Sequence, residues 1–213
     1  MTASKAKLDA IITSISSVLI GKEQEVRIAL TCLLARGHLL IEDLPGLGKT
    51  TLVNAMARVL GLDFNRIQFT SDLLPADIVG VSVYEKTDGA FRFLPGPVFC
   101  QMLLADEINR TTPKTQSALL EAMAEGQVTV EGRTRDLPEP FFVVATQNPI
   151  QHSGTFPLPE SQLDRFLMRV SLGYADQVSE KMILTGGDPR ARLKELEPLL
   201  TIRELLALQD EVD

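Results

Sequence analysis

A short segment, residues 38–51, constrains the fold more than any other part of the chain: His-Leu-Leu-Ile-Glu-Asp-Leu-Pro-Gly-Leu-Gly-Lys-Thr-Thr. Its apolar run at residues 39–41 is typical of a buried strand. Pro45, Gly46 and Gly48 favour a tight loop, and the residues after them can open a helix. A strand, a glycine-rich loop and a helix in this order direct several backbone N–H groups at one point. The segment therefore predicts a phosphate-binding loop.

The loop departs at one position from the phosphate-loop pattern G-x-x-x-x-G-K-[ST], because Asp43 replaces the first glycine. Asp43 lies at the end of the expected strand, away from the glycines that must approach the phosphates, so we expect the replacement to have little effect. Lys49 is predicted to reach the β- and γ-phosphates, and the Thr50 hydroxyl is predicted to bind Mg²⁺. Nucleotide contacts are predicted for the loop residues Pro45, Gly46, Leu47, Gly48, Lys49, Thr50 and Thr51.

The rest of the chain alternates strand patterns with helical patterns. Further strands are predicted at residues 65–69, 102–105, 141–145 and 167–172. Helical spacing of apolar residues occurs before the loop, directly after it, and again from about residue 113. This alternation predicts an α/β fold with a parallel sheet flanked by helices. In such sheets ligands bind at the carboxyl ends of the strands, so polar residues just past those ends are candidates for the site.

Two segments read as β-hairpin insertions between these core elements. Residues 81–84 and 91–93 flank the turn signal Asp88-Gly89, and residues 127–130 and 134–137 flank Glu131-Gly132. We therefore expect two hairpins in addition to the parallel sheet.

Composition argues against several classes of function. The chain has 28 acidic and 21 basic residues, a formal net charge of −7, so it offers no large basic field and nucleic acid is an unlikely main partner. Cys32 and Cys100 lie far apart in apolar runs and read as buried thiols of a reducing compartment, which favours the cytoplasm. The two histidines, His38 and His152, have no Cys/His cluster around them, which argues against a transition-metal site.

The N-terminal segment superficially resembles a signal peptide, because Lys5 and Lys7 precede an apolar stretch at residues 11–20. Apolar residues from Leu8 to Leu19 fall at helical spacing, Asp9 interrupts this series, and no small-residue cleavage site follows. We expect an amphipathic packing helix here, and no membrane span anywhere in the chain.

Three polar groups follow the ends of predicted strands. Asp106 is placed to hold Mg²⁺ directly or through water, and Glu107 is placed to orient and polarise an attacking water. Asn148 could hydrogen-bond that water or the γ-phosphate. Taken alone, Asp106 and Glu107 could also be a solvated strand end or a helix cap, and Asn148 could be a turn residue before Pro149.

Arg165 is a candidate of a different kind, because it is expected on a short helix at the edge of the domain. There it could reach the phosphates of a neighbouring subunit, as arginine fingers do. The alternative is a salt bridge with Asp164 or Glu160, which the sequence does not separate from the catalytic role. Arg110 is a second edge arginine with a weaker claim.

Five linked motifs, at residues 43–50, 104–110, 113–123, 145–149 and 157–166, together resemble the MoxR family of AAA+ ATPases. The resemblance runs from about Leu8 to the end of the chain. It implies a P-loop NTPase fold in which Lys49 and Thr50 belong to Walker A and Asp106 and Glu107 to Walker B. It also implies that Asn148 is sensor 1, that Arg165 is an arginine finger, and that Ile20 and Gly21 line the adenine.

The same resemblance implies a function. Such a protein would hydrolyse ATP to ADP and phosphate as a hexameric, chaperone-like motor that remodels or activates partner proteins. The family further implies partners with von Willebrand A domains and roles in the maturation of metal-dependent enzymes. The two hairpins would correspond to the helix-2 insert and the pre-sensor hairpin, which face the ring pore or the partner.

The resemblance also implies a domain division, with an α/β core at residues 1–198 and the start of a helical lid at residues 199–213. Residues 201–204, Thr-Ile-Arg-Glu, form a capping box that opens a helix carrying Leu205, Leu206 and Leu208. We expect the apolar face of this helix to lack a later segment to pack on. The rest of the lid, with its sensor 2 arginine, would lie beyond Asp213.

Three other functions stay open on the sequence. A nucleic-acid motor of the same clade would use Lys86, Arg133 and Arg135 in the hairpins, although Asp88 and Glu131 offset these charges. A nucleotide-gated scaffold with negligible turnover is disfavoured by Glu107. The sequence does not distinguish a chelatase-type ATPase subunit from the chaperone-like motor. The residues at the two hairpin tips do not identify a substrate.

Overall fold

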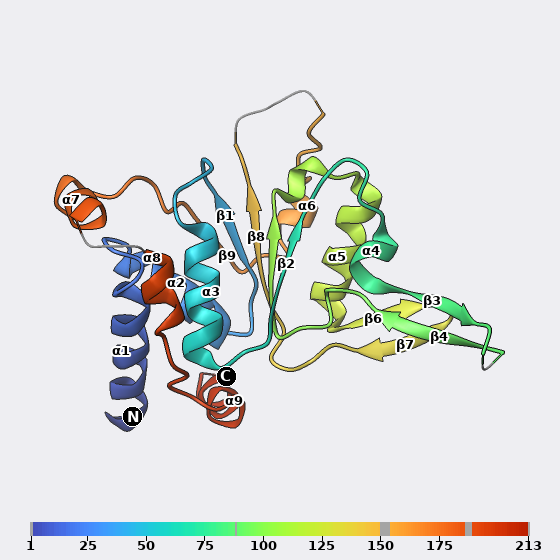
Figure 1. The fold of residues 1–213 in the computed structure, drawn as a ribbon, viewed down its shortest axis with the longest axis horizontal. Helices are drawn as coiled ribbons and strands as arrows, with labels where there is room; N and C mark the ends of the chain where they lie inside the picture. The colour runs from blue at the N-terminus through green and yellow to red at the C-terminus, as the bar shows by residue number, and fades with distance from the viewer. Residues whose placement is uncertain (1, 88, 150–153, 186–188, 213) are drawn as a thin grey trace.

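The computed structural model describes residues 2–87, 89–149, 154–185 and 189–212; Asp88, His152 and Asp213, all named above, lie outside the described residues. Its centre is a parallel sheet (Figure 1). The sheet is built from β1 (Leu39–Glu42), β2 (Phe64–Gln68), β5 (Met102–Asp106), β8 (Phe142–Gln147) and β9 (Met168–Val170), in the order β2-β5-β8-β1-β9. The predicted strands and the predicted α/β fold are confirmed.

Helices cover both faces of the sheet, since alternate strand residues point to opposite sides. Leu39 and Ile41 join a core that also contains side chains of helices α1, α2, α3 and α9, whereas Leu40 joins a second core with α5. On the first side lie α1 (Thr2–Ser16), α2 (Glu23–Leu34), α3 (Lys49–Leu60), α8 (Pro189–Lys194) and α9 (Ile202–Asp210). On the second side lie α4 (Pro75–Val79) and α5 (Pro113–Glu125).

Three short elements complete the described chain: the 3₁₀ turn η1 (Ile108–Arg110), α6 (Glu160–Leu163) and α7 (Gln177–Thr185). Sequence reasoning did not predict α7 or α8. Both follow the last strand in a segment with few buried apolar residues, so the helical periodicity that marks a packed face is weak there.

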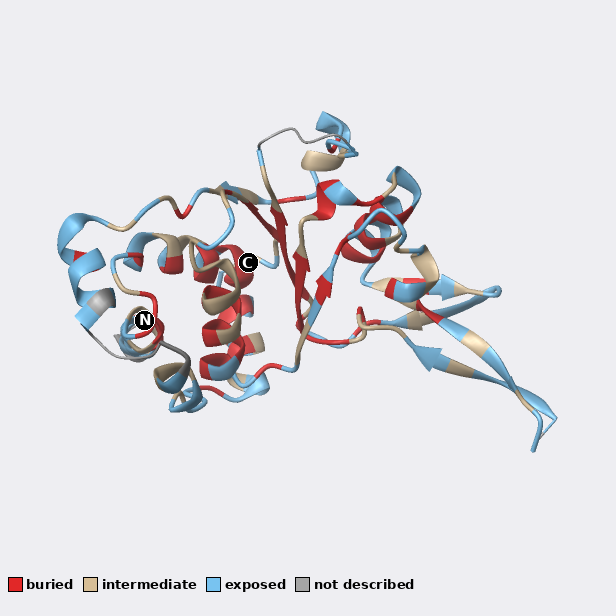
Figure 2. Cartoon of the chain, turned by 45° about the horizontal axis from the view of Figure 1, so that its top comes forward, coloured by how far each residue is buried: buried red, intermediate tan, exposed pale blue. Residues whose placement is uncertain are grey.

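Both predicted hairpins are present and project from the sheet as largely exposed ribbons (Figure 2). One pairs β3 (Gly80–Glu85) with β4 (Ala90–Pro95), and the other pairs β6 (Gln127–Val130) with β7 (Arg133–Asp136). The guanidinium of Arg135 lies 3.8 Å from the ring centroid of Phe93, so a cation–π contact joins the two hairpins.

The C-terminal helix α9 begins at the predicted capping box, in which the Thr201 hydroxyl accepts the Glu204 N–H and the Glu204 carboxylate accepts the Thr201 N–H. The sequence led us to expect no later segment for its apolar face, and the face packs on an earlier one. Leu205 and Leu208 are buried in the same core as α2, and the Gln209 amide donates to the Leu33 carbonyl at 2.7 Å. The division into core and lid at residue 198 stays a prediction.

The two cysteines are free and buried, as predicted, and burial raises the pKa of both thiols to about 12. The N-terminal segment forms the predicted packing helix, since Ile11, Ile12 and Ile15 are buried. Among the described residues, no helix is both long enough and apolar enough to cross a membrane.

His38 lies buried at the start of β1 and ties three elements together. Its Nδ1 accepts the Val143 N–H at 3.0 Å, and its Nε2 lies 3.1 Å from the Met123 carbonyl, to which it donates in the neutral tautomer that leaves Nδ1 free. Its own carbonyl accepts the Leu167 N–H. Burial lowers the pKa of His38 below its usual 6.5, although the Met123 carbonyl opposes that shift. A proton on Nδ1 would break the bond to Val143.

This arrangement predicts a pH-dependent stability. The pKa of His38 is lower in the folded chain than in the unfolded chain. The contribution of His38 to the free energy of unfolding is therefore complete above about pH 6.5 and declines as the pH falls below that value. His38→Gln should lower the free energy of unfolding at pH 7.5 by about 1–3 kcal/mol, since buried partners lose their bonds. In urea unfolding, the free energy of unfolding should fall less between pH 7.5 and pH 5.5 in this variant than in the wild type. His152→Gln is the matched control, and equal pH slopes in wild type and His38→Gln would contradict the prediction.

Candidate active site

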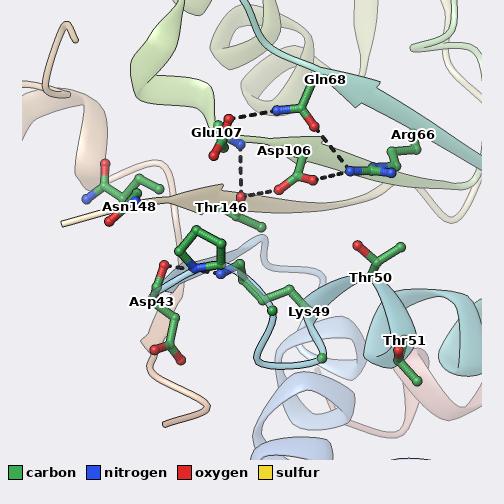
Figure 3. Close-up of a pocket in the computed structure, with 14 residues that line it drawn as sticks. Asp43, Lys49, Thr50, Thr51, Arg66, Gln68, Asp106, Glu107, Thr146 and Asn148 are labelled. Atoms are coloured by element: carbon green, nitrogen blue, oxygen red, sulfur yellow. Dashed lines mark hydrogen bonds and ion pairs between the residues drawn. The ribbon is translucent and has the colours of Figure 1, made fainter. Parts of the chain in front are cut away.

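A cavity of about 420 Å³ lies at the carboxyl edge of the sheet (Figure 3). One wall is the loop between β1 and α3, and the other is formed by the ends of β2, β5 and β8. The residues that line it are Asp43, Pro45, Gly46, Gly48, Lys49, Thr50, Thr51, Arg66, Gln68, Asp106, Glu107, Thr146, Gln147 and Asn148. Of the predicted site residues, the cavity thus brings together most of the loop with Asp106, Glu107 and Asn148.

The loop has the backbone geometry that a phosphate site needs. Gly46 and Gly48 have φ values of 88° and 93°, in the left-handed region where glycine is favoured, and Gly48 is the N-cap of α3. The first residues of α3 line the cavity, and the N–H groups of a first helical turn have no acceptor within the helix. The Lys49 ammonium donates to the carbonyls of Asp43 at 3.1 Å and Leu44 at 2.6 Å. Burial lowers the pKa of Lys49, while the carboxylates of Asp43, Asp106 and Glu107 act to raise it.

The carboxylates at the end of β5 are held by a threonine of the neighbouring strand. The Thr146 hydroxyl donates to Asp106 Oδ1 at 2.7 Å and accepts the Glu107 N–H at 2.9 Å. One buried side chain thus fixes both the Asp106 carboxylate and the backbone of Glu107. Glu107 has a φ of 59°, which is uncommon for a residue with a side chain and which turns the chain sharply after β5.

Two side chains of β2 reach the same carboxylates. Arg66 donates to Asp106 Oδ2 at 2.6 Å, and the Gln68 amide donates to Glu107 Oε2 at 2.8 Å. Arg110 also donates to Glu107 Oε2 at 2.8 Å, and this bond raises the pKa of its guanidinium. Arg66 further donates to Gln68, so these groups form one connected polar network.

A second cavity, of about 600 Å³, adjoins the first across the loop, because Gly46, Gly48 and Thr51 line both. It is more apolar and contains the predicted residues Ile20 and Leu47, together with Leu19, Gly173, Tyr174 and Ala175. Gly21 is not in its lining. This glycine has a φ of 75°, and an added Cβ would lie 2.4 Å from Ser179 Oγ, so Gly21 permits the close approach of α7 to this segment.

The remaining predicted residues have different positions. Asn148 lines the first cavity, and its carbonyl accepts a bond from the Asn109 amide at 3.2 Å. Arg165 follows α6, is exposed, and lines neither cavity. No salt bridge joins it to Asp164 or Glu160 in the part of the chain that the structure describes. The roles assigned to these residues stay predictions.

Sequence reasoning missed several residues of the site. Arg66 and Gln68 lie at the carboxyl end of β2, where the rule that found Asp106 could also have found them. Thr146 was part of a predicted strand end, but the sequence gives no sign that its hydroxyl bonds Asp106. Asp43 was expected to matter little, whereas its carboxylate is buried and accepts four hydrogen bonds.

Known proteins are similar in sequence to most of this chain. The family described as "ATPase family associated with various cellular activities (AAA)" matches residues 38–168. Uncharacterized protein YeaC of Bacillus subtilis (strain 168) is 51% identical over 198 residues, which cover 93% of this chain and 62% of YeaC. Chaperone MoxR1 of Mycobacterium tuberculosis is 44% identical over 205 residues, 95% of this chain and 53% of MoxR1. Protein MoxR of Paracoccus denitrificans is 36% identical over 182 residues, 83% of this chain and 53% of that protein.

The fold has a close structural relative as well. The crystal structure of a candidate ATPase from Cytophaga hutchinsonii ATCC 33406 has a TM-score of 0.87 and 40% identity, over 99% of this chain and 64% of that one. This chain thus spans between about half and two thirds of the length of these relatives. With the family match over its central residues and relatives named MoxR, the chain belongs to the MoxR branch of the AAA+ ATPases.

Proposed function

We propose that this chain binds ATP and hydrolyses it to ADP and phosphate. The main support is that Lys49 of the glycine loop lines the same cavity as Asp106 and Glu107 at the end of β5. The loop suits the phosphates, and the adjoining apolar cavity suits the base of the nucleotide. Membership in a family of ATPases supports the same conclusion.

Mg²⁺ fits the donor set of this cavity. Thr50 and Asp106 offer a hydroxyl and a carboxylate, and few protein oxygens suffice for Mg²⁺ because it keeps waters and phosphate oxygens as further ligands. Among the described residues, no cluster of three or more His, Cys, Asp or Glu side chains could hold a metal ion. In the proposed site, Thr50 and Asp106 would hold the ion together with the nucleotide, where it would neutralise phosphate charge.

Glu107 is the group placed to accept a proton from the attacking water. Its carboxylate accepts bonds from Gln68 and Arg110, which hold it at the cavity wall. Lys49 would place its charge on the phosphates once its bonds to the two loop carbonyls are exchanged for phosphate oxygens. Asn148 lies in the same lining, where it could position the water.

A single substitution separates binding from hydrolysis. Glu107→Gln removes the base but keeps the size and polarity of the side chain, so turnover should fall about 10²-fold or more. ATP affinity should stay within about threefold, since the loop contacts are intact. Phosphate release and binding of a fluorescent ATP analogue measure the two quantities. Glu121→Gln, on the exposed side of α5, is the matched control. Unchanged turnover in Glu107→Gln would contradict the assigned role.

We extend the proposal to a hexameric ring in which Arg165 completes the site of a neighbouring subunit. The exposure of Arg165 and its position outside both cavities support a role in trans rather than in its own site. An arginine that stabilises transferred phosphate from a neighbouring subunit is worth about 10³–10⁵ in rate in known systems.

Mixing two inactive variants tests the shared site. Glu107→Gln and Arg165→Ala should each lack turnover, because each chain alone forms defective interfaces throughout. In an equal mixture about one quarter of interfaces would pair an intact Glu107 with an intact Arg165, so about one quarter of wild-type activity should return. No recovery, with both variants folded and binding ATP, would place Arg165 in a structural role.

The purpose of hydrolysis is proposed from the relatives. One is named a chaperone, which supports a motor that remodels or activates partner proteins. Proteins with von Willebrand A domains and metal-dependent enzymes are candidate partners on the family resemblance alone. The free, buried cysteines support a cytoplasmic location. A nucleic-acid role is disfavoured, since the guanidinium of Arg135 is already engaged by the Phe93 ring and by the Val130 and Arg133 carbonyls. A chelatase-type subunit stays an alternative.

A further inference from the structure

Asp43, the residue that departs from the phosphate-loop pattern, is bonded to a segment far away in sequence. Its side chain is only 7% exposed. Oδ2 accepts the N–H groups of Leu172 at 2.5 Å and Gly173 at 2.8 Å and the Ser171 hydroxyl at 3.2 Å. Oδ1 accepts the N–H of Leu44 at 3.1 Å. One carboxylate therefore joins the phosphate loop to the segment that follows β9.

Lys22 binds the same segment through its backbone carbonyls. It is also only 7% exposed, and it is the residue that directly precedes α2. Its ammonium donates to the carbonyls of Leu172 at 2.5 Å and Tyr174 at 2.8 Å, while its nearest acidic partner, Glu25, lies 4.0 Å away. Lys22 is thus held by backbone carbonyls more closely than by its acidic neighbour.

Residues 171–174 form no helix or strand, so their backbone groups need partners from elsewhere. Asp43 supplies acceptors for the N–H groups of this segment, and Lys22 supplies donors for its carbonyls. A glycine at position 43 would leave the N–H groups of Leu172 and Gly173 without the Asp43 carboxylate. The aspartate therefore has a function that the glycine of the usual pattern could not perform.

The segment held in this way is a wall of the apolar cavity. Gly173, Tyr174 and Ala175 line that cavity together with Leu19 and Ile20, and residues of the glycine loop line both this cavity and the phosphate cavity. Lys22 follows the Ile20–Gly21 segment directly in the chain. The two charged residues thus connect three parts of the pocket: the phosphate loop, the segment at residues 18–22, and the wall after β9.

We infer that Asp43 and Lys22 are positioning residues that set the width and register of the base pocket relative to the phosphate loop. The inference rests on the proposed nucleotide binding and adds which residues determine the contribution of the base to it. Asp43 lines the phosphate cavity and Lys22 lines the apolar cavity, and the charged group of each is bonded to the wall after β9. Loss of either residue should lower the affinity for a nucleoside triphosphate, because its base and ribose contact the pocket wall. Inorganic tripolyphosphate has neither group, so its affinity should depend on the loop alone.

The test compares ATP with tripolyphosphate as competitors for a fluorescent ATP analogue. Asp43→Asn turns one acceptor oxygen into an NH₂ group that faces the N–H donors, so the wall should shift. We expect ATP affinity to fall about tenfold, because charge-assisted bonds to the backbone are lost, while tripolyphosphate affinity changes less than about twofold. Lys22→Met, which keeps the apolar stem without the donors, should change the same ratio in the same direction.

Asp77→Asn is the matched control, because Asp77 also accepts a backbone N–H, from Leu74, but is exposed on α4 away from both cavities. An ATP-to-tripolyphosphate ratio unchanged in Asp43→Asn, or an equal loss for both ligands, would overturn the inference. Loss of folding in both Asp43→Asn and Lys22→Met would also overturn it, since the contacts would then be elements of the fold. A wild type that binds neither ligand would instead refute the proposed function.

Discussion

The site depends on the parallel pairing of β5 with β8 and of β8 with β1. This register brings the end of β5 level with Thr146 of β8, and it brings the loop after β1 to the same edge. The Thr146 hydroxyl can then bond both the Asp106 carboxylate and the Glu107 N–H. A shift of one residue in either pairing would turn these side chains to the other face of the sheet, so the register of the three strands also determines the chemistry of the site.

Much of this could be predicted from the sequence, because the signals are local. The glycine loop, the five strands and both hairpins follow from turn residues and apolar runs of a few residues. The pairing of Asp106 and Glu107 with the loop follows from the rule that strand ends converge in parallel sheets. The fold of residues 171–212 was harder, because short helices with few buried residues carry little periodicity. The burial of Leu205 and Leu208 against α2 depends on a contact between distant segments, which a local pattern does not record.

Asp43 illustrates why a pattern can mislead. From the phosphate-loop pattern alone, we expected the replacement of the first glycine by Asp43 to have little effect. In the fold it is a buried carboxylate whose four donors come from the next residue and from a segment more than a hundred residues later. A buried charge is costly unless it is hydrogen-bonded, so its partners must be specific. The bonds of Arg66 and Gln68 to Asp106 and Glu107 also depend on the fold, because they form only when β2 lies beside β5.

The central claim is that the glycine loop, the carboxyl ends of the central strands and the wall after β9 form a single nucleotide site. Amide hydrogen exchange, measured as ATP with Mg²⁺ is added, tests this claim most directly. The account predicts slower exchange at residues 45–51, 18–21 and 173–175, all with the same dependence on ATP concentration, and little change in the two hairpins. Unchanged exchange at residues 45–51, with protection confined to another part of the chain, would contradict it.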